Sequence, residues 1–149
     1  MNGHATSSAT TFRMETSVGT NIKAEAKKIM SLLTNAGNFT KWNSTVISLE
    51  GSIRQGETIR LKSSLDAKRT FKLKVSETTP TKMVWEDGFA PMFKGVRTFT
   101  LKPQTDGSTD FVMVEEFKGL MLPMIKGSLP DFKANFEQYA ADLKREAEK

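Results

Sequence analysis

Hydrophobic and polar residues alternate with a period of two along most of the chain, a pattern typical of strands with one buried face. In residues 11–18, Phe12 and Met14 alternate with charged or polar neighbours, which predicts a first strand. In residues 45–118 the alternation returns between turn signals such as Asp106-Gly107, which predicts six further strands. The apolar positions of these strands include Ile47, Leu49, Ile59, Leu61, Phe71, Leu73, Val75, Met83, Trp85, Phe99, Leu101, Phe111, Met113 and Phe117.

Two segments show helical spacing instead. Apolar residues recur at intervals of three or four over residues 22–33, which predicts a helix capped by Thr20 or Asn21, with a short helical turn after it. Residues 128–147 predict a long C-terminal helix, because Ser128 and Asp131 begin a capping-box pattern. At 1.5 Å per residue this helix would be roughly 30 Å long, enough to cross a sheet. Its apolar stripe consists of Phe132, Phe136, Tyr139 and Leu143.

The order of these elements favours an α+β fold. Strands joined by short turns pair as antiparallel neighbours, and their alternation implies one packed face and one exposed face. The C-terminal helix is long enough to cover the packed face, so we expect a curved seven-stranded antiparallel sheet wrapped around that helix. Residues 1–10 are rich in Ser, Thr, Asn, Gly and Ala and are expected to form a flexible leader. Residues 11–149 are expected to form a single domain.

The amino-acid composition of the chain argues against several functional classes. The chain contains no cysteine, which excludes disulfides, thiolate metal sites and cysteine nucleophiles. Its net charge is +5, but basic residues are interleaved with acids and the densest clusters, Lys27-Lys28 and Lys68-Arg69, are only pairs. Nucleic-acid binding is therefore not expected. No apolar run approaches the ~18–20 residues of a membrane span, and we expect a soluble, cytoplasmic protein that is a monomer or weak homodimer.

The order of the elements and four local motifs resemble the START-like superfamily, also called SRPBCC, which includes polyketide cyclases and lipid-transfer domains. The resemblance covers residues 10–147 and implies a helix-grip fold, in which the sheet grips the last helix with a cavity between them. Members bind lipids, sterols, polyketides or plant hormones, some catalyse cyclisation or dehydration, and a chaperone-activating branch binds a protein instead. The motifs are Trp42 after the first helix, Glu50-Gly51 with Gly56 five residues later, Phe93-Lys94-Gly95-Val96-Arg97, and Glu115-Glu116-Phe117-Lys118-Gly119.

Arg97 and Glu115 are the most informative pair of charged residues. Each shares a strand face with apolar neighbours, and if the chain reverses at Asp106 the two lie directly opposite one another. Two charges on an apolar face are costly unless they pair or bind something polar. The pair therefore either anchors a polar group of a ligand or forms an ion pair that only holds the strand register. Exposure of both groups through a bulge is a third alternative.

A cavity between the sheet and the last helix would be lined by residues from their apolar faces. Methionine suits a pocket for irregular ligands, whereas each aromatic residue could equally fill the core. Trp42, Phe89 and Phe93 are candidates for its mouth or wall, and residues 89–93 form an apolar turn that indicates a lid or contact surface. The predicted ligand-binding residues are Phe71, Trp85, Arg97, Phe99, Met113, Glu115, Phe117, Met121, Met124, Phe132, Phe136 and Tyr139.

Catalytic chemistry has few candidates in this sequence. The single histidine, His4, lies in the expected leader, so neither a serine–histidine triad nor a histidine metal site is expected. Phosphate-binding and dinucleotide motifs are absent from the sequence, and no cofactor is predicted. Glu115 or Tyr139 could act as a proton donor in a cavity, so whether the protein is an enzyme stays open.

The leading prediction is a protein that binds an apolar or amphipathic small molecule of the lipid, polyketide or aromatic metabolite type. One alternative is a cyclase, dehydratase or hydrolase that uses the same cavity. The other is a protein-binding module of the chaperone-activator kind.

Overall fold

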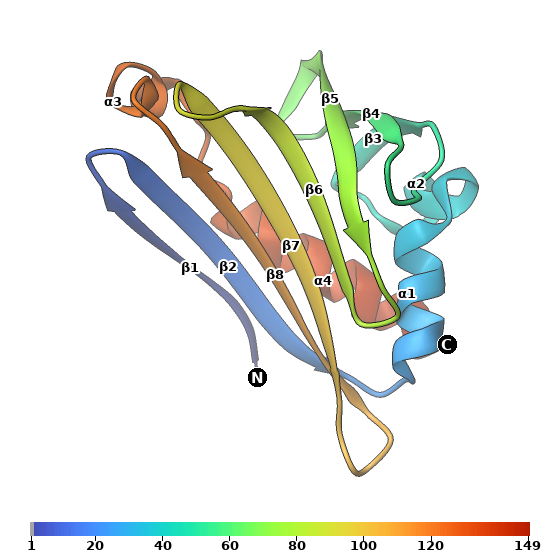
Figure 1. Cartoon of the computed structure of the whole chain (residues 1–149). Coiled ribbons are helices and arrows are strands. Elements are labelled where there is room, and N and C mark those ends of the chain that lie inside the picture. The colour runs from blue at the N-terminus through green and yellow to red at the C-terminus, as the bar shows by residue number, and fades with distance from the viewer. Residues whose placement is uncertain (1) are drawn as a thin grey trace.

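The computed structural model describes residues 2–149, which form one antiparallel sheet, a long C-terminal helix and several short helices (Figure 1). Met1, assigned above to the leader, lies outside the described residues. The strands are β1 (Asn2–Thr10), β2 (Arg13–Ile22), β3 (Val46–Glu50), β4 (Thr58–Ser63), β5 (Asp66–Thr78), β6 (Lys82–Phe89), β7 (Phe93–Pro103) and β8 (Thr109–Lys118). The helices are α1 (Ala26–Thr34), α2 (Phe39–Trp42), α3 (Leu122–Ile125) and α4 (Lys133–Ala147), with two short 3-10 helices, η1 (Ala36–Asn38) and η2 (Lys126–Ser128).

The strands lie in the order β1-β2-β8-β7-β6-β5-β4-β3, and each pair of neighbours is antiparallel. The predicted α+β class is confirmed, and the predicted strands correspond to β2–β8. The predicted register of the last hairpin is also confirmed, since Arg97 lies opposite Glu115 and Phe99 lies opposite Met113. No helix within residues 2–149 combines the length and the apolar character needed to cross a bilayer.

The sheet has eight strands rather than the predicted seven, because residues 2–10 form β1 where a flexible leader was expected. The hydroxyl groups of Thr6 and Ser17 lie 3.1 Å apart across the β1–β2 ladder. The backbone N–H of Ala5 donates to the carboxylate of Glu137 on α4 at 3.0 Å. Small polar residues predominate along β1, so its sequence lacks the apolar alternation by which a strand is recognised.

The first helix begins later than predicted. Ile22 continues β2 opposite Thr109, and α1 begins only at Ala26. The predicted caps Thr20 and Asn21 are therefore wrong, since both residues lie in the strand. The spacing of apolar residues across residues 22–33 spans the end of a strand and a helix, which periodicity alone does not separate.

The C-terminal helix begins at Lys133 rather than at Ser128, so the predicted capping box is wrong. Leu129 is extended, with φ −77° and ψ 138°, because the ring of Pro130 disfavours helical backbone in the residue before it. The carboxylate of Asp131 accepts from the backbone N–H of Lys133 at 3.0 Å, which satisfies one free donor at the helix start. The helix has 15 residues and is about 22 Å long.

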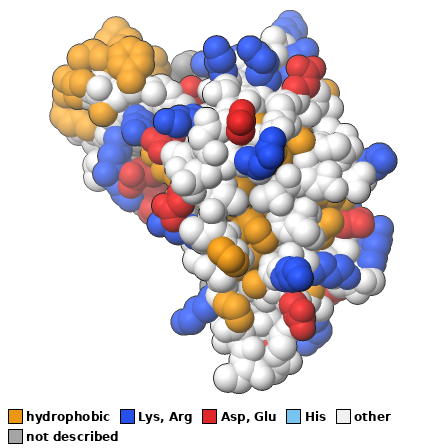
Figure 2. Space-filling view, turned by 45° about the vertical axis from the view of Figure 1, so that its right-hand side comes forward, with side chains coloured by type: hydrophobic (Ala, Val, Ile, Leu, Met, Phe, Trp, Pro, Cys, Tyr) orange, Lys and Arg blue, Asp and Glu red, His pale blue; other side chains and the backbone are white. Residues whose placement is uncertain are grey.

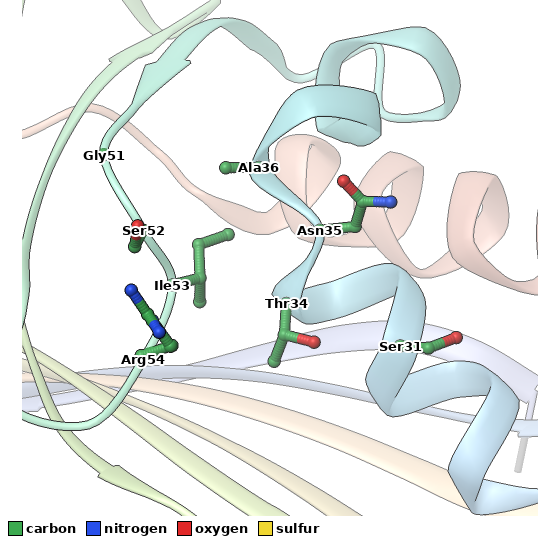
Figure 3. A pocket seen from close by; sticks show the side chains of 8 residues that line it. All are labelled: Ser31, Thr34, Asn35, Ala36, Gly51, Ser52, Ile53 and Arg54. Carbon is green, nitrogen blue, oxygen red and sulfur yellow. The ribbon is translucent and has the colours of Figure 1, made fainter.

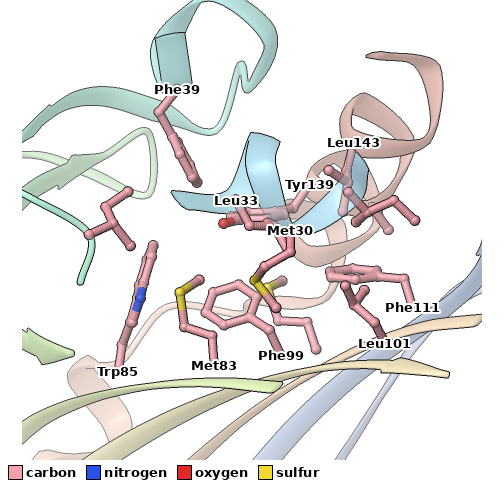
Figure 4. Packing of buried hydrophobic residues seen from close by; sticks show 14 of the residues in the cluster. Met30, Leu33, Phe39, Met83, Trp85, Phe99, Leu101, Phe111, Tyr139 and Leu143 are labelled. Carbon is pink, nitrogen blue, oxygen red and sulfur yellow. The ribbon is translucent and has the colours of Figure 1, made fainter. Parts of the chain in front are cut away.

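The core lies where α4, α1 and α2 cover the middle strands of the sheet (Figure 4). Aromatic rings and methionines from β6 and β7 meet side chains from all three helices there. Because these large side chains exclude solvent completely, they hold α4 rigidly along the sheet. The largest fully buried aromatic residues are Phe39, Trp85, Phe99, Phe111, Phe136 and Tyr139.

Candidate functional site

Arg97 of β7 and Glu115 of β8 form an ion pair that faces α4 from the sheet. The Nε atom and one terminal nitrogen of Arg97 each lie 3.2 Å from Oε1 of Glu115. The guanidinium carbon lies 5.0 Å from the ring centre of Phe136 and 5.8 Å from that of Tyr139, both on α4. The pair is thus enclosed between sheet and helix, with its side chains 15% and 14% exposed.

This ion pair leaves hydrogen-bonding capacity unused on both groups. A guanidinium has five N–H donors and a carboxylate has about four acceptor positions. The contacts converge on one carboxylate oxygen, whereas a fork-to-fork arrangement would use both. Because both side chains keep some exposure, their remaining atoms can bind a polar group that approaches from the accessible side.

The electrostatic surroundings favour the protonated form of Glu115. Burial raises the pKa of Glu115 above its ordinary value of 4.5, and the charge and hydrogen bond of Arg97 offset only part of this rise. The carboxylate of Asp87 on β6 adds to the rise by repulsion. Asp87 was not among the predicted ligand-binding residues, although its position two residues after Trp85 places it on the same strand face.

A file of aromatic rings leads from the ion pair toward the turn between β6 and β7. The ring of Phe136 packs against Phe132 at 6.0 Å between centres, and Phe132 packs against Phe117 at 5.6 Å. Phe117 in turn stacks on Phe93 at 5.6 Å, with 12° between the ring planes. Phe136 is fully buried, whereas the other three rings are half-buried. We call these four residues the aromatic file.

Gly95 of β7 makes room for this file. It lies opposite Phe117 in the ladder, and a Cβ atom placed on it would come within 3.0 Å of Cε1 of that ring. Real Cβ contacts are rarely so short, so a larger residue would require the ring of Phe117 to move by a few tenths of an ångström. The absence of a side chain at Gly95 therefore lets the ring of Phe117, and with it the aromatic file, lie against β7.

Beyond the ion pair, the packed core contains polar atoms that make no hydrogen bond. Within residues 2–149, the indole N–H groups of Trp42 and Trp85 and the hydroxyl of Tyr139 are buried without a partner. The ring of Phe39 lies 6.2 Å from those of Trp85 and Tyr139, so it packs between them. Unpaired buried donors are costly, so these three groups lower the stability of the core.

Most of the predicted ligand-binding residues come together in this region. Trp85, Phe99 and Met113 belong to the solvent-free core and lie next to the ion pair on the same face of the sheet. The remaining members contact one another around the ion pair and along the aromatic file. These members are Arg97, Glu115, Phe117, Phe132, Phe136 and Tyr139.

Three predicted ligand-binding residues lie elsewhere. Phe71 is half-buried on β5, with the guanidinium of Arg69 4.7 Å above its ring. Met121 and Met124 are 40% and 80% exposed around α3, at the end of the molecule, because the α3 turn directs them outward. They belong to an exposed group that we call the apolar tip, which consists of Phe12, Phe89, Met92, Leu120, Met121 and Met124.

Two hollows of the surface lie away from the ion pair. One, of about 410 Å³, lies between the end of α1 and the loop after β3 (Figure 3) and is lined mainly by small and polar residues. The other, of about 430 Å³, lies between β1, β2 and α4. Both volumes would fit a small molecule, but both hollows are open to solvent. The second hollow does lie between the edge of the sheet and the C-terminal helix, but none of the predicted ligand-binding residues lines either hollow. The first is lined by Ser31, Thr34, Asn35, Ala36, Gly51, Ser52, Ile53 and Arg54.

The chain is similar to one protein family in sequence and to several solved structures in fold. A family model described as "Polyketide cyclase / dehydrase and lipid transport" matches residues 11–148. The structure of the Zhui aromatase/cyclase from Streptomyces sp. R1128 is similar, with a TM-score of 0.70, 12% sequence identity and coverage of 91% of this chain and 94% of that one. A START superfamily protein from Mycobacterium smegmatis has a TM-score of 0.67 at 17% identity, covering 90% and 97% of the two chains. A search of curated proteins found no significant match.

Proposed function

The chain belongs to the polyketide cyclase/dehydrase and lipid transport family, and from this premise we propose that it binds an apolar small molecule with a polar head between the sheet and α4. The START-like resemblance predicted from the sequence is confirmed by the family match and by the similar structures.

One observation supports the proposal most directly: the Arg97–Glu115 ion pair lies at the inner end of the aromatic file. The rings of the file offer apolar contact area to the body of a ligand, and three of them are only half-buried. The unused guanidinium donors offer hydrogen bonds to a carboxylate, carbonyl or phenolate oxygen. A ligand that entered alongside the file would therefore bring its polar head to Arg97.

The test separates a ligand anchor from a purely structural ion pair. Arg97→Met leaves Glu115 buried without its partner, which should destabilise the fold by about 3–5 kcal/mol. The double variant Arg97→Met/Glu115→Gln removes both charges and should recover most of that stability. Anilinonaphthalene sulfonate, an aromatic body with one anionic head, serves as the probe in a fluorescence titration.

We expect the double variant to fold and to bind this probe at least about ten-fold more weakly than the wild type, because the anionic head loses its charge-assisted hydrogen bonds. Arg60→Met, at an exposed arginine of β4, is the matched control and should bind as the wild type does. Unchanged affinity in the double variant would contradict the anchor. A wild-type protein that does not bind the probe would favour the protein-binding alternative.

A second candidate function, an enzyme that uses the same site, is favoured by the raised pKa of Glu115. A carboxyl group that keeps its proton nearer neutral pH can donate it to a ligand oxygen during cyclisation or dehydration. Tyr139 is the weaker donor, because burial raises its pKa and the charge of Arg97 opposes this rise only in part. Glu115→Gln should then keep probe binding and abolish product formation from a poly-β-ketone, followed by mass spectrometry.

A further inference from the structure

The apolar tip is assembled from three turns that are far apart in the sequence. The backbone N–H of Gly119 donates to the carbonyl of Phe12 at 3.1 Å, which joins the end of β8 to the β1–β2 turn. The N–H groups of Leu120 and Met121 donate to the carbonyls of Pro91 and Met92 at 3.0 and 2.9 Å, which join it to the β6–β7 turn. The tip is therefore one hydrogen-bonded unit.

A glycine makes this close assembly possible. Gly119 has φ +146°, and a Cβ atom on it would lie 2.2 Å from the carbonyl oxygen of Met92. No L-amino acid with a side chain fits there without moving the β6–β7 turn, so the end of β8 and this turn are held in direct backbone contact.

The exposure of the tip is unusual for this molecule. Its side chains are exposed by 52% at Phe12, 70% at Phe89, 57% at Leu120 and 80% at Met124, with lower values at Met92 and Met121. Figure 2 shows the resulting group of hydrophobic side chains at the upper left, protruding beyond the sheet. Within residues 2–149, the other large exposed hydrophobic residue is Ile47 on β3.

Basic residues outnumber acidic ones around the tip. The three segments that build it, residues 10–13, 88–94 and 118–128, contain four basic residues and no acidic residue. Three of the basic residues are ion-paired with acidic residues of the sheet: Arg13 with Glu15 and Glu116, Lys94 with Glu86, and Lys118 with Glu116. The fourth, Lys126, donates to the backbone carbonyl of Thr10 at 2.7 Å. An apolar surface with an excess of positive charge beside it is complementary to the interface of an anionic lipid bilayer, where apolar side chains meet acyl chains and lysines meet lipid phosphates.

The shape of the tip argues against a second copy of the chain as its partner. Six side chains with these exposures present roughly 600 Å² of apolar surface, the upper end for a single patch on a monomer. A stable protein–protein interface buries about 800 Å² on each partner, of which little more than half is apolar, so area alone does not decide the partner. A protruding group of turns offers less flat area than an interface between two copies needs.

We propose that the apolar tip docks this protein on anionic lipid bilayers by inserting its side chains into the interfacial region. The aromatic file begins beside the tip, because Phe93 follows directly after Met92 in the β6–β7 turn. A docked tip would therefore turn the open end of the file toward the acyl chains. Vesicle binding itself does not require a ligand in the interior, so this inference stands or falls separately from the proposed function.

The experiment is co-sedimentation of the full chain with phosphatidylcholine vesicles that contain about 30% phosphatidylserine. Phe89→Glu/Met124→Glu places two carboxylates on the tip and should lower the bound fraction about ten-fold or more, because charged groups resist transfer into the interface. Ile47→Glu, half-exposed on β3, is the matched control and should bind as the wild type does. Since all three residues are exposed, the melting temperatures of the variants should stay close to that of the wild type.

A second arm tests the positive charge beside the tip. Lys126→Gln should weaken binding to the anionic vesicles about five-fold and leave binding to pure phosphatidylcholine vesicles unchanged. Equal binding by the wild type and Phe89→Glu/Met124→Glu would overturn the inference, as would a wild type that binds neither vesicle. A sedimentation-velocity dimer that dissociates in Phe89→Glu/Met124→Glu would also overturn it and assign the tip to a second copy.

Discussion

At the residue scale, the surroundings of Arg97 and Glu115 differ although the two form one ion pair. The guanidinium contacts the carboxylate and also lies over the rings of Phe136 and Tyr139, whose faces attract a cation. Glu115 pairs with Arg97 and is repelled by the carboxylate of Asp87. This imbalance explains why burial raises the pKa of Glu115 despite the ion pair.

The raised pKa predicts a definite pH dependence of stability. The folded state holds the proton of Glu115 more tightly than the unfolded state, so its contribution to stability falls as pH rises from 4.5 through the raised pKa. Glu115→Gln does not titrate. The unfolding free energy of the wild type minus that of Glu115→Gln should therefore decrease with pH across this window and become constant above it. Urea denaturation at pH values between about 4 and 7 measures the difference, and an increase with pH would contradict the assignment.

Gly95→Ala tests the path of the aromatic file. The added Cβ atom would lie 3.0 Å from the ring of Phe117, and moving that ring should destabilise the protein by about 1–3 kcal/mol. It should also weaken binding of the fluorescent probe. Gly127→Ala, where a Cβ atom meets open space, is the control and should leave both quantities nearly unchanged. Equal effects of the two substitutions in denaturation and titration would show that the ring is not held by the glycine.

At the scale of secondary-structure elements, α4 is fixed to the loop between α2 and β3 by one buried carboxylate. The carboxylate of Asp142 is 1% exposed and accepts from the backbone N–H and hydroxyl of Ser44 at 2.8 and 2.6 Å. The side-chain amide of Gln138 donates to its other oxygen at 2.7 Å. Burial alone would raise the pKa of Asp142, but these hydrogen bonds outweigh burial and lower the pKa below its ordinary 3.8.

Asp142→Asn should destabilise the fold by about 2–4 kcal/mol, because the amide cannot accept with both of its atoms. The stability that the carboxylate contributes is present above pH 3.8 and is lost as pH falls through the lowered pKa. Asp142→Asn has no carboxylate at this position, so it should not lose this part of its stability when the pH falls. Asp66→Asn in the exposed β4–β5 turn should change stability by less than about 0.5 kcal/mol. Urea denaturation at neutral and acid pH distinguishes the two variants, and equal losses would refute the role of Asp142.

At the scale of the whole molecule, the side chains between the sheet and α4 become more exposed from the core toward the apolar tip. Phe99 and Phe111 lie in the solvent-free core, Arg97 is slightly exposed, Phe117 is half-buried and Phe89 is largely exposed. Segments with few buried contacts open at lower free energy than the core does. We therefore expect a ligand to enter between the sheet and α4 at the end that carries the apolar tip.

Ligand binding should then stabilise the folded chain as a unit. A ligand at about 100 times its dissociation constant adds about 2.7 kcal/mol when it binds the folded state alone. For a chain of this size the melting temperature should rise by roughly 5–10 °C. Circular dichroism melting with anilinonaphthalene sulfonate checks this in the wild type, and Arg97→Met/Glu115→Gln should show a much smaller rise. An equal rise in both proteins would place the bound probe elsewhere.

The sequence alone determined those features that depend on local period and on turns. The alternation of residues 45–118 predicted the antiparallel strands, because a side-chain period of two assigns each residue to one face. A reversal at Asp106 was enough to place Arg97 opposite Glu115, since a tight hairpin turn sets the register of both strands. The order of the elements and the local motifs also resembled the START-like superfamily, and that resemblance supplied the fold family.

Only the tertiary structure decided the features built from distant segments. β1 pairs through backbone and hydroxyl groups without an apolar face, so no pattern marked it as a strand. Rings from β7, β8 and α4 form the aromatic file, and three separate turns form the apolar tip. The contacts between these segments join residues that are 15 to 107 positions apart, and periodicity within one element carries no information about them.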